Sequence, residues 1–170
     1  VQYDIEISDR RFLFLDTIEA NSHAGHYCKK RQLWLQNKLD ESLKKNQNVF
    51  IFMHHNPLPL AQLESDLIGL VDRDQFKSII SNYKKIIKHI FFGHQHITVS
   101  GNYLGIPFSA PRSINHPLVP NFSKEYRLGF ANTDPSYNIV LLNKDSLIIH
   151  NEDFLKTSVN WFETTKDIRE

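Results

Sequence analysis

The sequence has little cysteine and no strong charge excess, and each shortage excludes a class of protein. Its single cysteine, Cys28, cannot form an intrachain disulfide or build a thiolate metal site, which favours a reducing, cytoplasmic location. Lys and Arg number 20 against 19 for Asp and Glu. A nucleic-acid-binding surface usually shows a basic excess, so we expect no nucleic-acid partner.

Long apolar runs are also lacking. No stretch approaches the roughly 18 apolar residues that a membrane helix needs, so we expect no membrane partner. The chain has 170 residues and is 41% hydrophobic, which is typical of one packed domain, and it shows no internal repeat. The sequence therefore predicts one globular unit over residues 1–170.

The periodicity of apolar residues predicts an α/β fold. Lys29 to Lys45 carries a leucine stripe at helical spacing, and Asp72 to Tyr83 is a second predicted helix. Residues 49–53 and 86–92 are short apolar runs of the kind found in buried parallel strands. Extended segments are also predicted at 3–7, 12–15, 97–103, 105–110, 126–132, 137–142 and 146–150.

These elements form two strand–helix units followed by a run of strands, which indicates a parallel sheet with antiparallel additions, that is, a mixed sheet. Residues 111–125 contain three prolines and are predicted to form a loop.

Histidines follow both of the predicted parallel strands. His54 and His55 come after residues 49–53, and His94 and His96 come after residues 86–92. Ligands bind outside the carboxyl ends of strands in open α/β sheets, so the two clusters are expected to converge. Neutral imidazole is a good ligand for transition metals, and we predict a metal site with His54, His94 and His96 as ligands.

The His-x-His spacing has its own physical logic. In extended backbone, residues i and i+2 point to the same side, so His94 and His96 would face a metal while Gln95 points away. Gly93 would allow the backbone to pass close to the site. His55 is expected to point differently from His54. It either supports the ligands from behind or faces the substrate, or else it is a structural residue.

The remaining histidines have a simpler interpretation. A single histidine is more often a packing or surface residue than a ligand. His89 lies inside an apolar strand and is predicted to be structural. Surface or packing roles are predicted for His23, His26, His116 and His150.

The two histidine motifs together resemble those of a known family. Phe52 to Pro59 reads Phe-Met-His-His-Asn-Pro-Leu-Pro, and Phe91 to His96 reads Phe-Phe-Gly-His-Gln-His. In this order they resemble the last two metal motifs of the calcineurin-like metallophosphoesterases, and most of all the class III cyclic-nucleotide phosphodiesterases and glycerophosphodiesterases. The segment from Asp16 through Gly25 to Gln32-Leu33-Trp34-Leu35 and two later strands support this resemblance.

The resemblance implies an α/β/β/α sandwich with two metals, commonly Mn, Fe or Zn, at the strand ends. His54 and His94 would bind one metal and His96 the other. The implied reaction is metal-dependent hydrolysis of a phosphodiester. Arg112 and His116, in the proline-rich loop, are candidates for substrate contact.

The family's N-terminal ligand motifs, Asp-x-His, Gly-Asp-x-x-Asp and Gly-Asn-His-Asp/Glu, do not occur in this sequence. The only methionine is Met53, and the chain begins at Val1. We therefore expect the chain to be the C-terminal half of the domain and to have little activity alone. Its expected partner is the missing half or a second copy of the chain.

Two other interpretations stay open. The chain could be a truncated, non-catalytic module that binds a metal or a protein. It could also be a mononuclear zinc hydrolase that uses three histidines.

Overall fold

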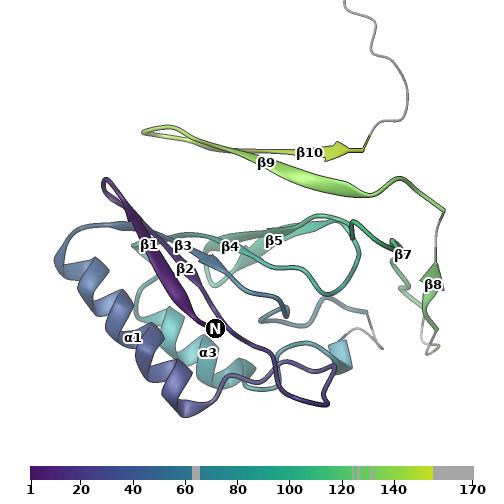
Figure 1. The fold of residues 1–170 in the computed structure, drawn as a ribbon, viewed down its shortest axis with the longest axis horizontal. Helices are drawn as coiled ribbons and strands as arrows, with labels where there is room; N and C mark the ends of the chain where they lie inside the picture. The colour runs from purple at the N-terminus through teal and green to yellow at the C-terminus, as the bar shows by residue number, and fades with distance from the viewer. Residues whose placement is uncertain (63–65, 124, 126, 131, 155–170) are drawn as a thin grey trace, which may run out of the picture.

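The computed structural model describes residues 1–62, 66–123, 125, 127–130 and 132–154. A six-stranded mixed sheet has the order β1-β2-β3-β4-β6-β5, and two further pairs, β9–β10 and β7–β8, form separate sheets (Figure 1). The strands are β1 Tyr3–Ile7, β2 Arg10–Phe14, β3 Asn48–Phe52, β4 Ile87–Phe91, β5 Val99–Tyr103, β6 Ile106–Ala110, β7 Leu118–Val119, β8 Gly129–Phe130, β9 Ser136–Leu142 and β10 Leu147–Asp153, and the helices are α1 Lys29–Lys44 and α3 Arg73–Ser81.

The predicted α/β class with a mixed sheet is confirmed. β2, β3, β4 and β6 run parallel, while β1 and β5 are antiparallel additions at the two edges. The connections between β2 and β3 and between β3 and β4 contain α1 and α3, as expected for parallel neighbours. The carboxyl ends of β3 and β4 therefore lie side by side.

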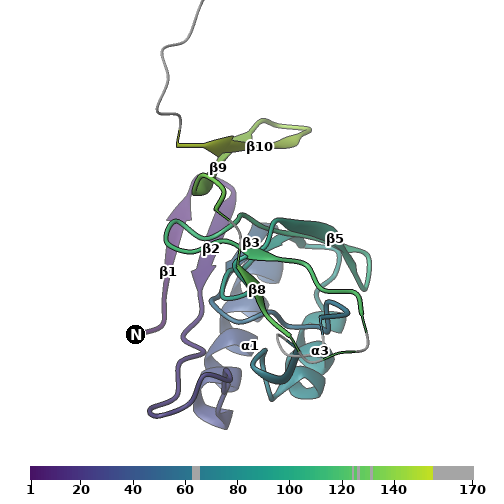
Figure 2. The ribbon, with the colours of Figure 1, turned by 90° about the vertical axis from the view of Figure 1, so that its right-hand side faces the viewer.

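One face of the sheet packs against both helices (Figure 2). Leu13, Ile51 and Ile90 lie on this face and are fully buried with Leu35 of α1 and Phe76 of α3. The predicted leucine stripe of α1 is only partly right, because Leu33 and Leu43 are 53% and 49% exposed. No helix in the described part of the chain is long and apolar enough to cross a bilayer.

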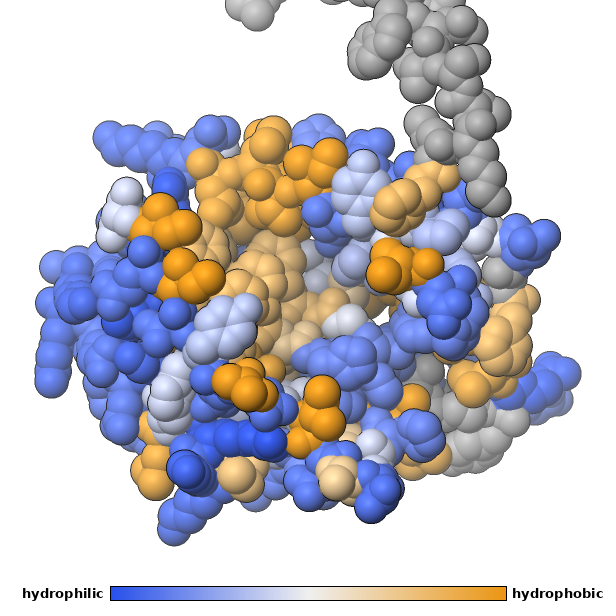
Figure 3. All heavy atoms as spheres, in the orientation of Figure 1, coloured by the Kyte–Doolittle hydropathy of each residue, from blue (hydrophilic) through white to orange (hydrophobic). Residues whose placement is uncertain are grey.

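The opposite face of the sheet carries a row of aromatic rings. Phe14, Phe52 and Phe91 stack across three strands with ring centroids 4.8 and 4.7 Å apart. The β9–β10 hairpin lies over this face (Figures 1 and 2), and apolar side chains gather between hairpin and sheet (Figure 3). The two faces of the sheet are thus covered very differently, by helices on one side and by a two-stranded hairpin on the other.

The region predicted as a loop contains one short strand. β7 lies within residues 111–125 and pairs with β8. The strand predicted over 126–132 shrinks to the two residues of β8, and residues 126 and 131 lie outside the described part of the chain. A two-residue pairing is too short to leave a periodic signal in the sequence.

Candidate metal centre

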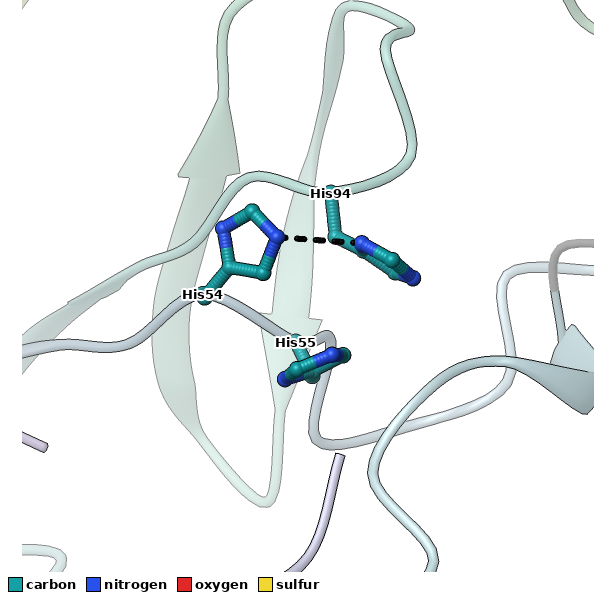
Figure 4. Close-up of side chains that lie close together, drawn as sticks. All are labelled: His54, His55 and His94. Atoms are coloured by element: carbon teal, nitrogen blue, oxygen red, sulfur yellow. Dashed lines mark hydrogen bonds between the residues drawn. The ribbon is translucent and has the colours of Figure 1, made fainter. Parts of the chain in front are cut away.

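The two histidine loops begin where β3 and β4 end. Phe52 and Phe91 are partners in the parallel register, and the Met53 amide donates to the Phe91 carbonyl at 3.0 Å. The Gly93 amide then donates to the His54 carbonyl at 3.0 Å, so the two loops stay paired beyond the last residues of the strands. This pairing brings His54 and His94 together, as the sequence predicted (Figure 4).

His54 and His94 present their ring nitrogens to each other. Nε2 of His54 lies 3.1 Å from Nδ1 of His94. Two imidazole nitrogens at metal-bond length from one tetrahedral or octahedral cation are separated by roughly 3.0–3.4 Å. The observed distance therefore fits two ligands of a single divalent cation.

Three imidazoles form a close group in this place. The ligand atoms of His54, His55 and His94 all lie within 4.8 Å of one another. Nε2 of His94 is buried and has no hydrogen-bond partner of good geometry in the described structure, although the backbone carbonyl of Ile68 lies near it. A polar environment that leaves a buried ring nitrogen unsatisfied is a further sign of a site built for a ligand.

His96 lies beside this group but outside it. Its Nδ1 donates to the backbone carbonyl of His116 at 2.9 Å, and the two rings pack at 4.3 Å. Metal-binding histidines usually donate their second ring nitrogen to a carbonyl or carboxylate in this way, which leaves Nε2 as the ligand atom. The assignment of His96 to a second metal stays a prediction.

The backbone of the His-x-His loop differs from the extended form that was predicted. His94 and His96 have φ angles of +66° and +54°, in the left-handed region that costs a residue with a Cβ about 1–2 kcal/mol. Gln95 does turn away from the histidines: it is buried, and its Nε2 donates to Oδ1 of Asn56 at 2.5 Å. This side-chain bond joins the two ligand loops and helps to hold the left-handed residues.

Gly93 is not where the backbone passes closest to the site, contrary to the prediction. A Cβ added at Gly93 would meet no atom closer than 3.9 Å. The close approach occurs at Gly25, in the segment between β2 and α1, where an added Cβ would lie 2.4 Å from Cγ of His55. Glycine is therefore required at Gly25, because any side chain would collide with the imidazole ring.

His55 is held at both ring nitrogens. Nδ1 lies 2.7 Å from the hydroxyl oxygen of Thr17, and Nε2 lies 3.2 Å from the carbonyl oxygen of His23. The His55 ring is 4.4 Å from the His94 ring and 4.9 Å from the His54 ring. His55 thus lies in the cluster, but both of its ring nitrogens are hydrogen-bonded to other groups of the protein.

The electrostatics favour neutral rings. Burial lowers the pKa of His94 and of His55 to about 4, and the neighbouring histidines contribute to the same effect. The pKa of His54 is also lowered, first by burial and then by the charge of His96. Neutral imidazole is the form that binds a metal, so these rings are ready for ligation at neutral pH.

The candidate substrate residues lie apart from the three-histidine group. Arg112 forms an ion pair with Asp153 at the end of β10, so its guanidinium holds the hairpin. His116 packs between the His96 ring and Phe130, whose ring is 6.0 Å away. Their predicted contact with substrate stays a prediction.

Sequence reasoning missed Thr17, Gly25 and Asn56 as parts of the site. Asn56 lies within a motif that carried the resemblance, so its position there was a usable signal. Thr17 lies 38 residues before its partner, and nothing in its own neighbourhood predicts the contact.

Known proteins resemble this chain in sequence and in fold, although no family model matches it. It is 29% identical to a probable cyclic nucleotide phosphodiesterase from Rhodopseudomonas palustris over 83% of this chain and 52% of that protein. It is 29% identical to glycerophosphodiester phosphodiesterase GpdQ from Enterobacter lignolyticus over 56% of this chain and 34% of that one. A solved dimetal phosphatase from Danio rerio superimposes with a TM-score of 0.67 at 14% identity, covering 89% of this chain and 57% of that one.

The chain thus resembles phosphodiesterases in sequence and a dimetal phosphatase in fold, which agrees with the metallophosphoesterase resemblance of its histidine motifs. The chain spans about half the length of the relative that it matches over the longest stretch. Partial coverage is consistent with the expectation that the chain represents one part of such a protein.

Proposed function

We propose that this chain supplies imidazole ligands to the divalent-metal centre of a phosphodiesterase. The observation that carries the proposal is the 3.1 Å separation of His54 Nε2 and His94 Nδ1 at the carboxyl ends of paired strands. Mn, Fe and Zn all suit imidazole ligands, and His96 is the proposed ligand of a second cation. The relatives named above are a probable cyclic nucleotide phosphodiesterase and a glycerophosphodiester phosphodiesterase, which supports a phosphodiester as substrate.

Each residue has a distinct task in this proposal. His54 and His94 would hold one cation between them, and the hydrogen bond from Nδ1 of His96 to the His116 carbonyl would leave Nε2 as the ligand atom of His96. When bound, the cations supply Lewis-acid neutralisation of the phosphate oxygens and a low-pKa water as nucleophile. The lowered pKa values of His54 and His94 keep protons from competing with the cation near neutral pH.

The three-histidine group contains no carboxylate. We propose that the remaining ligands come from a further polypeptide segment or from a second copy of this chain. The outward face of the β9–β10 hairpin supports a covering partner, because Tyr137, Ile139 and Leu141 are 39–46% exposed there. A well-behaved monomer of the bare chain in light scattering would contradict this part of the proposal.

The test compares the chain with a longer product of its gene. The chain alone is expected to bind Co²⁺ through imidazole nitrogen and to show little hydrolysis of bis-p-nitrophenyl phosphate with Mn²⁺. A longer product that also contains the Asp-x-His, Gly-Asp-x-x-Asp and Gly-Asn-His-Asp/Glu motifs is expected to hydrolyse this ester. The His94→Ala substitution in that longer product should remove the activity.

Each alternative predicts a different outcome. No hydrolysis by the longer product would favour a non-catalytic module. Robust turnover by the chain alone with one equivalent of Zn²⁺ would favour a mononuclear three-histidine hydrolase.

A further inference from the structure

Thr17 reaches the histidine cluster from a part of the chain that carries no ligand. It follows β2 and is 1% exposed. The Thr17 carbonyl accepts a hydrogen bond from the His26 amide at 2.9 Å, which fixes the backbone at this point. Its hydroxyl oxygen then lies 2.7 Å from Nδ1 of His55.

The contacts of His55 define its tautomer. The His23 carbonyl can only accept a hydrogen bond, so Nε2 of His55 carries the proton at 3.2 Å. Nδ1 of the neutral ring is then an acceptor, and the Thr17 hydroxyl donates to it. With both nitrogens engaged, the His55 ring is not available as a ligand, although it lies within the 4.8 Å group.

The ring of His55 is also confined from two sides. The backbone of Gly25 lies so close that an added Cβ would be 2.4 Å from Cγ of His55. The imidazole of His94 lies on the ring as well, with centroids 4.4 Å apart. His55 therefore fills the space between the β2–α1 segment and the ring of His94.

The His94 ring needs a rigid neighbour such as His55 to hold it in position. The left-handed backbone of His94, with φ of +66°, is a conformation that surrounding structure must hold in place. Nδ1 of the buried ring is hydrogen-bonded to His54, and a bound cation would replace that bond, which leaves the backbone carbonyl of Ile68 as its polar neighbour. Contact with the rigidly held His55 ring therefore helps to orient the His94 ring when the cation binds.

We propose that Thr17 is a positioning residue for the metal centre: by donating to Nδ1 of His55, it fixes the orientation of that ring, which in turn holds the His94 ring in the geometry that binds a divalent cation. The inference rests on the proposed function, because it assigns a role toward the same cation.

The experiment compares three variants of this chain. Thr17→Val keeps the shape and removes the hydroxyl, whereas Thr17→Ser keeps the hydroxyl and is the rescue variant. Ser109→Ala is the matched control, because the Ser109 hydroxyl lies 2.9 Å from Nε2 of the buried His89, in a histidine–hydroxyl pair outside the cluster. If Thr17→Val does not fold, Thr17→Ala takes its place.

Two measurements are made on each variant. Two-bond ¹H–¹⁵N NMR spectra of the metal-free chain report the tautomer of His55, and visible absorption during a Co²⁺ titration reports cation affinity. Thr17→Val is expected to keep the Nε2–H tautomer that the His23 carbonyl sets, to shift the Nδ1 resonance of His55 because its hydrogen bond is lost, and to bind Co²⁺ about 10-fold more weakly. Thr17→Ser and Ser109→Ala should match the unaltered chain in both.

The outcomes separate the inference from the proposed function. Unchanged Co²⁺ affinity in Thr17→Val, or an equal loss in Ser109→Ala, would overturn the inference while leaving the metal centre intact. If the unaltered chain shows no Co²⁺ absorption band at all, the proposed function itself is contradicted. A mixture of tautomers for His55 in the unaltered chain would overturn the inference without any metal.

Discussion

His55 and His89 are chemically similar residues in different places. Each is 4% exposed, each has a ring nitrogen near a hydroxyl oxygen, at 2.7 and 2.9 Å, and burial lowers the pKa of each to about 4. Their neighbours differ: His55 lies against the rings of His54 and His94, whereas His89 lies 4.2 Å from the ring of Phe91. A lowered pKa therefore marks burial in both cases, and only the convergence of several ligand groups marks the site.

The position of each residue in the sheet explains the difference. His89 is inside β4, where it pairs with Phe50 of β3 and its one polar contact is the Ser109 hydroxyl of β6. His55 comes after β3 has ended, where loops from several strands meet and polar groups can converge. In our proposal, the same side chain is therefore structural within the strand and positions a metal ligand beyond its end.

Removing a ligand ring should give the largest effect of this comparison. His94→Ala removes one of two nitrogens 3.1 Å apart, so Co²⁺ affinity is expected to fall by at least roughly 100-fold. His89→Gln, which keeps a polar partner for Ser109, should change the affinity by less than about 2-fold. The measurement is isothermal titration calorimetry of both variants with Co²⁺.

A similar loss in the two variants would break the comparison. It would mean that the affinity reports the general stability of the chain rather than ligation. Circular dichroism of both variants before titration provides the control for folding.

Two glycines give a second, smaller contrast. Gly25→Ala places a methyl group 2.4 Å from Cγ of His55, so it should lower the free energy of unfolding by about 1–3 kcal/mol. Gly93→Ala meets nothing closer than 3.9 Å and should be nearly neutral. Urea denaturation checks both, and a larger loss for Gly93→Ala would show that the ligand loop tolerates less change than its packing indicates.

The sequence predicted the strands and the loops that carry the candidate metal ligands, because both depend on local patterns. Apolar runs followed by His54 and His94 placed those side chains at the same sheet edge, where the structure has them. The left-handed backbone of His94 and His96 was not predictable, since residue spacing alone does not specify φ. Thr17 could not be found either, because its role depends on a tertiary contact across 38 residues.

The third contrast is the smallest and concerns protons rather than ligands. The pKa of His89 is about 4 in the folded chain, against an ordinary value of 6.5, because burial disfavours the charged ring. Between these values the unfolded chain binds one more proton at this residue. The contribution of His89 to the free energy of unfolding is therefore fully present above pH 6.5. It falls as the pH drops toward 4, by up to about 1.4 kcal/mol per pH unit.

His89→Gln should flatten the pH dependence of the unfolding free energy by this amount. Urea denaturation of the metal-free chain and of this variant at several pH values between 4 and 7 gives the two slopes, and the difference between them isolates His89 from all other titrating groups. Gln does not titrate and still offers a hydrogen bond to Ser109, so the change in slope cannot come from an unsatisfied hydroxyl. Equal slopes would show that His89 keeps an ordinary pKa, and the similarity in burial on which its comparison with His55 rests would then fail.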